Sequence, residues 1–164
     1  MDVPENFHPR YNCISKEYVY LIWNSRSRNP LYEGRALHFY RSMDSDSLND
    51  EIKDFLGTHD FTSLSGSREI VNGNIRTVKN ISIERQGELV KFTVEADGFL
   101  YHMVRNMVGI ICAISDGKIS SGEIINILEK KDRRLAGMTA PAEGLYLNKV
   151  FYGGVIDEKT GWKL

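Results

Sequence analysis

Residues 77–95 read TVKNISIERQGELVKFTVE, and this stretch decides the fold class. Apolar residues recur on both sides of Gln86-Gly87, as Val78, Ile81 and Ile83 before it and as Leu89, Phe92 and Val94 after it. This pattern predicts a β-hairpin whose strands cover residues 77–84 and 89–95, with its turn at Gln86-Gly87. Because a hairpin pairs its strands in opposite directions, the sheet cannot be purely parallel.

Further strands and helices are predicted on both sides of the hairpin. Residues 16–24 have apolar or aromatic side chains on both faces, which predicts a strand covered on both sides, and residues 145–152 form a last strand. One helix starts at a cap of Asp44 or Ser45 and stops at Gly57. Two more are expected over residues 99–115 and from Ser120 or Ser121 through Lys131. The fold class is α+β.

The composition is that of one domain with a core, because the 164 residues are 41% hydrophobic and 26% charged. We expect a connector over residues 1–14, an α/β domain over 15–152 and a polar tail over 153–164.

No apolar run approaches the roughly 20 residues of a membrane span, and the first residues contain no signal peptide, so no membrane partner is expected. The two cysteines, Cys13 and Cys112, lack the spacing of zinc ligands, which favours a reducing cytoplasm.

The net charge of −1 conceals a segregation of charge along the chain. Residues 44–60 contain six acidic residues and one base, whereas residues 1–43 contain four acidic and six basic residues. The six bases are Arg10, Lys16, Arg26, Arg28, Arg35 and Arg41, and a second basic cluster comprises Lys130, Lys131, Arg133 and Arg134. These segments are either solvated faces or a surface that meets a polyanion in one place and repels it in another.

The predicted helix over residues 99–115 has an unusual polar face. One side is apolar throughout, and Met103 and Met107 are interpreted as core filler. The other side collects Tyr101, His102, Arg105, Asn106 and Gly109, with no Lys or Glu. Arg105 either forms a structural ion pair or positions a carboxylate or a phosphate. Gly109, one turn later, would allow another backbone to come close.

Five segments, in order, resemble the TruA family of tRNA pseudouridine synthases. They are FHPRY at residues 7–11, KEYVY at 16–20, GTHDFTS at 57–63, HMVRN at 102–106 preceded by Phe99, and EGLYL at 143–147. The resemblance extends from Asn6 to Tyr152. It implies the C-terminal half of a pseudouridine synthase fold, with a mainly antiparallel sheet and helices packed on one side.

The resemblance also implies a reaction and a set of site residues. Family members isomerise uridine to pseudouridine at nucleotides 38–40 of the tRNA anticodon stem-loop, as homodimers, without a metal or an organic cofactor. By similarity Tyr18 and Arg105 are catalytic residues: Tyr18 packs against the target base and Arg105 pairs with a catalytic aspartate. Arg10, His102 and Leu145 join Tyr18 in binding the substrate, with Leu145 lining the pocket.

One family motif has no counterpart. The nucleophile lies in an Arg-Thr-Asp motif of the N-terminal half, but the single Arg-Thr pair of this sequence, Arg76-Thr77, is followed by Val78. The chain therefore resembles the C-terminal half alone, with the N-terminal half of the same protein as a missing partner. We expect no turnover by this chain alone, an Arg105 without its family partner, and an unusually apolar surface where the other half docks.

Two other functions fit the residues. The chain could be a non-catalytic RNA-binding module that stacks bases on aromatic strand residues, although the RNP1 pattern of an RRM is absent. It could also be a structural or dimerisation domain.

Overall fold

A computed structural model describes residues 12–67 and 73–152, and its centre is a six-stranded, mostly antiparallel sheet. The strand order is β2-β1-β5-β4-β3, and β6 pairs with β1. The strands are β1 (Cys13–Trp23), β2 (Leu37–His38), β3 (Gly57–Asp60), β4 (Ile75–Gln86), β5 (Leu89–Ala96) and β6 (Leu145–Tyr152). The α+β class is confirmed, although the sequence did not indicate the short strands β2 and β3.

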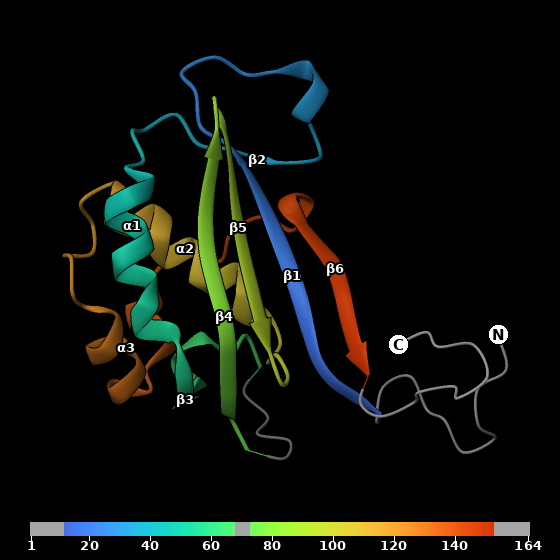
Figure 1. Ribbon diagram of the computed structural model, residues 1–164. Helices are drawn as coiled ribbons and strands as arrows, with labels where there is room; N and C mark the ends of the chain where they lie inside the picture. The colour runs from blue at the N-terminus through green and yellow to red at the C-terminus, as the bar shows by residue number, and fades with distance from the viewer. Residues whose placement is uncertain (1–11, 68–72, 153–164) are drawn as a thin grey trace, which may run out of the picture.

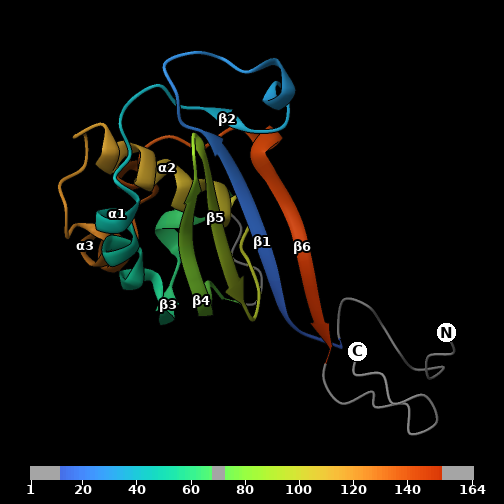
Figure 2. The ribbon, with the colours of Figure 1, turned by 45° about the horizontal axis from the view of Figure 1, so that its top comes forward.

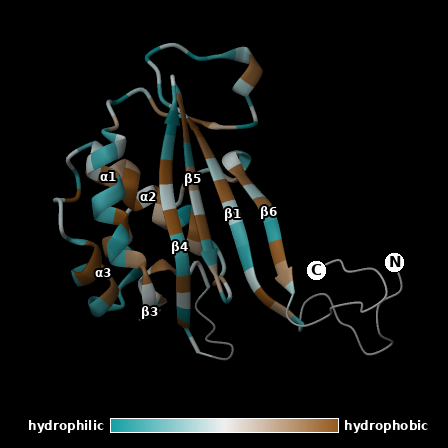
Figure 3. Ribbon diagram, viewed as in Figure 1, coloured by the Kyte–Doolittle hydropathy of each residue, from teal (hydrophilic) through white to brown (hydrophobic). Residues whose placement is uncertain are grey.

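The hairpin β4–β5 forms as predicted, with a shift of one residue at its turn. Gln86 pairs with Leu89, so the loop is Gly87-Glu88 instead of the predicted Gln86-Gly87. Gly87 has a φ of 61°, a conformation that a residue with a side chain rarely adopts, which explains why the glycine lies inside the loop. Alternate β5 residues, Val90, Phe92 and Val94, are fully buried. Figure 3 shows the matching alternation of hydropathy along β4.

Three helices cover one face of the sheet: α1 (Ser45–Glu51), α2 (Met103–Ser115) and α3 (Ile124–Lys130). They gather beside β3, β4 and β5, whereas β1 and β6 form the opposite margin of the sheet (Figures 1 and 2). None of the described helices has the length and hydropathy needed to cross a membrane.

The helix boundaries differ from the predicted ones for local reasons. Asp44 caps α1 as predicted, and its carboxylate accepts from the backbone of Asp46 and Ser47. The helix predicted to begin at Phe99 begins four residues later, because His102 has a φ of 63° and interrupts the helical conformation. The helix predicted from Ser120 or Ser121 begins only at Ile124.

The core lies between the sheet and the helices. Tyr20, Phe92, Met103 and Met107 are among its largest fully buried side chains, so the prediction that both methionines fill the core is confirmed. The burial of β1 agrees with the prediction that both of its faces are covered: Tyr20 and Ile22 are buried on one face and Val19 on the other. The three α-helices cover only one of these faces. On the other face cover is local: the ring of Trp23 stacks on Tyr32 in the short 3-10 helix η1 (Pro30–Tyr32).

The predicted connector and tail fall largely outside the described residues. Of the connector, residues 1–11 are not described, and Cys13 and Ile14 already belong to β1. The predicted tail, residues 153–164, is outside the described ranges as well.

Candidate functional site

Arg105 is held by backbone instead of by an acid. The residue lies half-buried in the first turn of α2, and its Nε donates to the carbonyl oxygen of Ala140 at 2.6 Å. The backbone N–H of Ala140 in turn donates to the carbonyl oxygen of Arg105 at 3.1 Å. Among residues 12–67 and 73–152 no carboxylate lies within 4.0 Å of this guanidinium, so the structural ion pair that the sequence left open is not formed there.

Tyr20 holds the next peptide of the same segment. Its hydroxyl donates to the carbonyl oxygen of Pro141 at 2.7 Å. Burial is the main cause that raises the pKa of Tyr20 above its ordinary value, with additions from Cys112 and Glu143, while the nearby charge of Arg105 opposes the rise. Tyr20 therefore remains a protonated donor, and Arg105 and Tyr20 together bind two successive carbonyls.

This double attachment fixes the start of β6. Leu145, its first residue, pairs with Tyr20 of β1. At the preceding residue, Gly144, a β-carbon would lie 2.7 Å from the backbone oxygen of Leu21 and 2.7 Å from the ring of Tyr20. Only glycine permits such a close approach. Leu145 is thus held, half-buried, beside Tyr20.

Tyr18 lies two residues before Tyr20, on the same face of β1. Its half-buried ring makes a T-shaped contact with the ring of Phe99, with centroids 5.0 Å apart and an interplanar angle of 86°. Opposite Tyr18 on β6 is Leu147, whose side chain is 54% exposed. The sequence-predicted residues Tyr18, Leu145 and Arg105 thus all lie at the β1–β6 margin or at the N-terminal end of α2.

His102 forms the cap position of α2, directly before its first residue. Its ring stacks on Tyr101 at 3.7 Å between centroids and lies so close to Gly66 that a β-carbon there would be 2.7 Å from Nδ1. Burial, followed by the charges of Arg105 and Arg133, lowers the pKa of His102 below its ordinary value of 6.5. The imidazole is therefore neutral at pH 7.

Arg133 joins this end of α2 through a buried amide. Its Nη2 donates to Asn106 Oδ1 at 2.8 Å and to Thr139 Oγ1 at 2.7 Å. Asn106 is fully buried, and its Nδ2 donates to the carbonyl oxygen of Leu64 at 2.6 Å. In the described part of the chain Arg133 also has no carboxylate within 4.0 Å. The sequence indicated Arg133 only as part of a basic cluster.

Gly109 brings the neighbouring loop against α2. A β-carbon at this position would overlap the carbonyl oxygen of Met138. The prediction that another backbone comes close at Gly109 is therefore confirmed. This close contact holds residues 138–141 along the helix, where Ala140 meets Arg105.

Arg105 is anchored through its Nε alone, which leaves the outer part of the guanidinium available to a further partner. The terminal nitrogens of Arg105 make no hydrogen bond to any other described residue, and the neighbouring imidazole is neutral. Arg10, the remaining predicted substrate-binding residue, lies outside the described residues. Within residues 12–67 and 73–152 no group of three or more His, Cys, Asp or Glu side chains is placed to hold a metal ion.

Comparison with known proteins supplies the context for this geometry. A family described as "tRNA pseudouridine synthase" matches residues 52–153. The tRNA pseudouridine synthase A of Acetivibrio thermocellus is 42% identical over 151 residues, which cover 92% of this chain and 62% of the relative. The corresponding proteins of Methylacidiphilum infernorum (43% identical, 59% of the relative) and Streptococcus suis (40%, 61% of the relative) also match 92% of this chain. The chain thus spans about 60% of the length of these relatives.

Proposed function

The chain belongs to the tRNA pseudouridine synthase family, and on this premise we propose that the full-length protein isomerises uridine to pseudouridine in the anticodon stem-loop of tRNA. In this reaction the bond from the ribose to N1 of uracil breaks, the base turns, and a bond to C5 forms while the proton of C5 is lost and N1 gains one. No co-reactant is consumed.

The observation that carries the proposal is the state of Arg105. It is a half-buried guanidinium without a carboxylate among the described residues, anchored at Nε and with its terminal nitrogens directed to no described partner. An Arg–carboxylate pair keeps an acid ionised and fixes its direction. We assign to Arg105 the orientation of a catalytic aspartate that enters the site from a segment outside these 164 residues.

Tyr18 supplies a flat surface for the target base. A base taken out of its stack requires an apolar, planar partner, and stacking on an aromatic ring contributes on the order of 1–3 kcal/mol. The T-shaped contact with Phe99 supports the ring of Tyr18, so that the orientation of the ring is set before the base arrives. Leu145 lines the pocket, and His102 and Arg10 contribute to binding of the RNA.

The neutral state of His102 fits this assignment. A second full positive charge beside Arg105 would compete for the aspartate, whereas a neutral imidazole offers a hydrogen-bond donor and an acceptor to RNA. We further propose that the full-length protein is a homodimer and acts in the cytoplasm. Light scattering of the full-length protein tests its dimeric state.

The test of the isomerase assignment joins this chain to the part of the A. thermocellus relative that it does not match. The joined protein is incubated with unmodified tRNA, and pseudouridine is measured by chromatography of the digested nucleosides. We expect turnover by the joined protein and none by the 164-residue chain alone. Turnover by the chain alone would refute the proposal that the catalytic aspartate comes from a segment outside these 164 residues. Tight tRNA binding by a folded joined protein that forms no pseudouridine would favour a non-catalytic RNA-binding module.

A further inference from the structure

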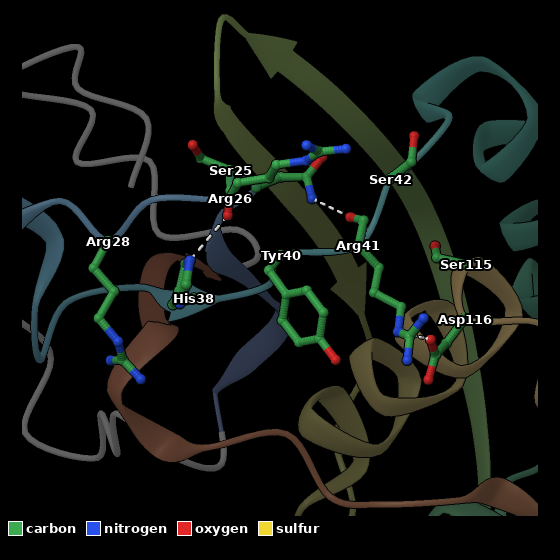
Figure 4. A pocket seen from close by; sticks show the side chains of 10 residues that line it. Ser25, Arg26, Arg28, His38, Tyr40, Arg41, Ser42, Ser115 and Asp116 are labelled. Carbon is green, nitrogen blue, oxygen red and sulfur yellow. Dashed lines mark hydrogen bonds and ion pairs between the residues drawn. The ribbon is translucent and has the colours of Figure 1, made fainter.

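A second basic region lies at the opposite end of α2 from the candidate site. It is a hollow of about 1030 Å³ lined by residues of the segment that follows β1, of the segment around β2, and of the C-terminal end of α2. We name it the arginine hollow; its charged and aromatic side chains are Arg26, Arg28, His38, Tyr40, Arg41 and Asp116. Figure 4 shows these side chains around the hollow.

The arginine hollow carries positive charge that the described residues do not neutralise. Three arginines face one carboxylate, Asp116. That carboxylate already pairs with Arg41 and with Lys118, whose Nζ is 2.6 Å away. The hydrogen bond from Lys118, together with the charges of both partners, lowers the pKa of Asp116, so the group stays ionised and occupied. Arg26 and Arg28 are exposed and have no carboxylate within 4.0 Å among the described residues.

A fixed backbone presents these arginines. Asn24 Nδ2 donates to the carbonyl oxygens of Phe39 at 2.9 Å and Arg41 at 2.6 Å, which ties the two ends of the segment together. His38 Nε2 donates to the carbonyl oxygen of Ser25 at 2.9 Å. The short parallel pair of β1 and β2 closes the base of the segment. The guanidinium groups of Arg26 and Arg28 therefore extend from a braced turn, which limits the entropy lost when they bind.

The size and the aromatic wall of the hollow favour a polymer over a single small anion. Three guanidinium groups are spread around an open space of about 1030 Å³. Tyr40 is 61% exposed, and the guanidinium carbon of Arg41 lies 5.3 Å from the centre of its ring. Guanidinium groups bind phosphates, and exposed rings beside them contact sugars and bases, which is the combination that RNA-binding surfaces use.

We propose that the arginine hollow binds backbone phosphates of the tRNA at a distance from the target uridine. The inference rests on the proposed function, because it takes the RNA of that reaction as the occupant. The 13 residues of α2 separate the two basic regions, which corresponds to about 20 Å along the helix axis. The hollow therefore holds nucleotides outside the uridine pocket and contributes affinity, while Arg105 and Tyr18 contribute to the reaction.

The test measures binding of unmodified tRNA to the 164-residue chain by fluorescence anisotropy over a range of salt concentrations. The variant R26Q/R28Q removes two charges from the hollow. The matched control K53Q/K79Q removes two exposed charges from η2 (Ile52–Phe55) and β4, away from the hollow. We expect the first variant to bind about tenfold more weakly near 0.1 M salt and to lower the salt slope by about 2, and the control to change neither.

The outcomes separate this inference from the isomerase assignment. Equal affinity and slope in both double variants, or no tRNA binding by the chain, would overturn the inference. The inference would also be overturned if R26Q/R28Q bound inorganic polyphosphate more weakly but bound tRNA with unchanged affinity. The isomerase assignment fails on a different result, which is the absence of pseudouridine from the joined protein whatever the behaviour of R26Q/R28Q.

Discussion

The two ends of α2 are both basic, but they hold their charge in different ways. At the N-terminal end Arg105 and Arg133 are half-buried and bound to carbonyl, amide and hydroxyl oxygens. At the C-terminal end Arg26, Arg28 and Arg41 are exposed, and Arg41 pairs with Asp116. A half-buried charge with neutral partners lowers the stability of the fold, and we interpret that cost as serving to fix a position. Exposed charges cost little stability and act mainly on binding affinity.

This difference teaches how one short helix can serve two tasks. Backbone contacts such as Arg105 to Ala140 and Tyr20 to Pro141 restrict motion at one end, as orientation of a reacting group requires. In our proposal the other end contacts a polymer at several points and tolerates looser geometry. The changes below alter one end and leave the other intact.

The largest effect on stability is expected from Gly109→Ala. In a helix interior this change ordinarily stabilises by about 1 kcal/mol, because alanine is the better helix former. Here the added methyl group would overlap the carbonyl oxygen of Met138 and push the loop that carries Ala140 away from Arg105. We expect a loss of about 3 kcal/mol in the free energy of unfolding, measured by urea denaturation. An unchanged or higher urea midpoint would show that the loop is not held as described.

A smaller effect, confined to activity, is expected from Tyr18→Leu in the joined protein. Leucine keeps the apolar contact with Phe99 but removes the ring on which the base stacks. Pseudouridine formation should slow on the order of tenfold or more, which corresponds to the loss of one stacking contact of about 1–3 kcal/mol. Tyr18→Phe is the matched control and should keep more of the rate than leucine does. Equal rates for Tyr18→Leu and the unchanged protein would exclude a stacking role.

The smallest effect concerns the titration of His102. Burial and the charges of Arg105 and Arg133 disfavour the imidazolium, so its pKa in the folded chain lies below 6.5. Since the unfolded state binds this proton more readily, the contribution of His102 to stability is lost as the pH falls below about 6.5. Arg105→Gln removes one positive neighbour and should raise the pKa of His102, as followed by NMR. His59, which bonds the carbonyl of Leu56, is the internal control. If the pKa of His102 does not change in Arg105→Gln, the proximity of His102 and Arg105 is refuted.

The parts of the fold that follow from local sequence were predicted well. The hairpin, the cap at Asp44 and the close approach at Gly109 each depend on a few adjacent residues or on one missing side chain. The short strands β2 and β3, of two and four residues, carry too little periodicity to be recognised. His102 adopts a left-handed conformation and packs against the distant Gly66, and no local pattern indicates either feature.

The residues of the candidate site were predictable from the sequence, but the contacts that hold them in place were not. Arg105 was identified because a guanidinium on a helix face without Lys or Glu is unusual, and Tyr18 and Leu145 followed from the family resemblance. The contacts that hold them join residues far apart in the sequence: Tyr20 with Pro141, and Arg133 with Asn106. Such pairs depend on the tertiary fold, so neither Tyr20 nor Arg133 was identified as part of the site. The roles of Tyr18, Arg105 and Leu145 remain predictions.

The division of labour between the two ends of α2 is tested most directly by single-turnover kinetics of the joined protein at increasing tRNA concentration. We predict that Arg105→Gln lowers the rate at saturating tRNA by about 100-fold or more, with partial recovery in Arg105→Lys, since misplacement of a reacting group by about 1 Å has an effect of that size. R26Q/R28Q should keep the saturating rate and require about tenfold more tRNA to reach it. A saturating rate that falls in R26Q/R28Q and persists in Arg105→Gln would contradict the account.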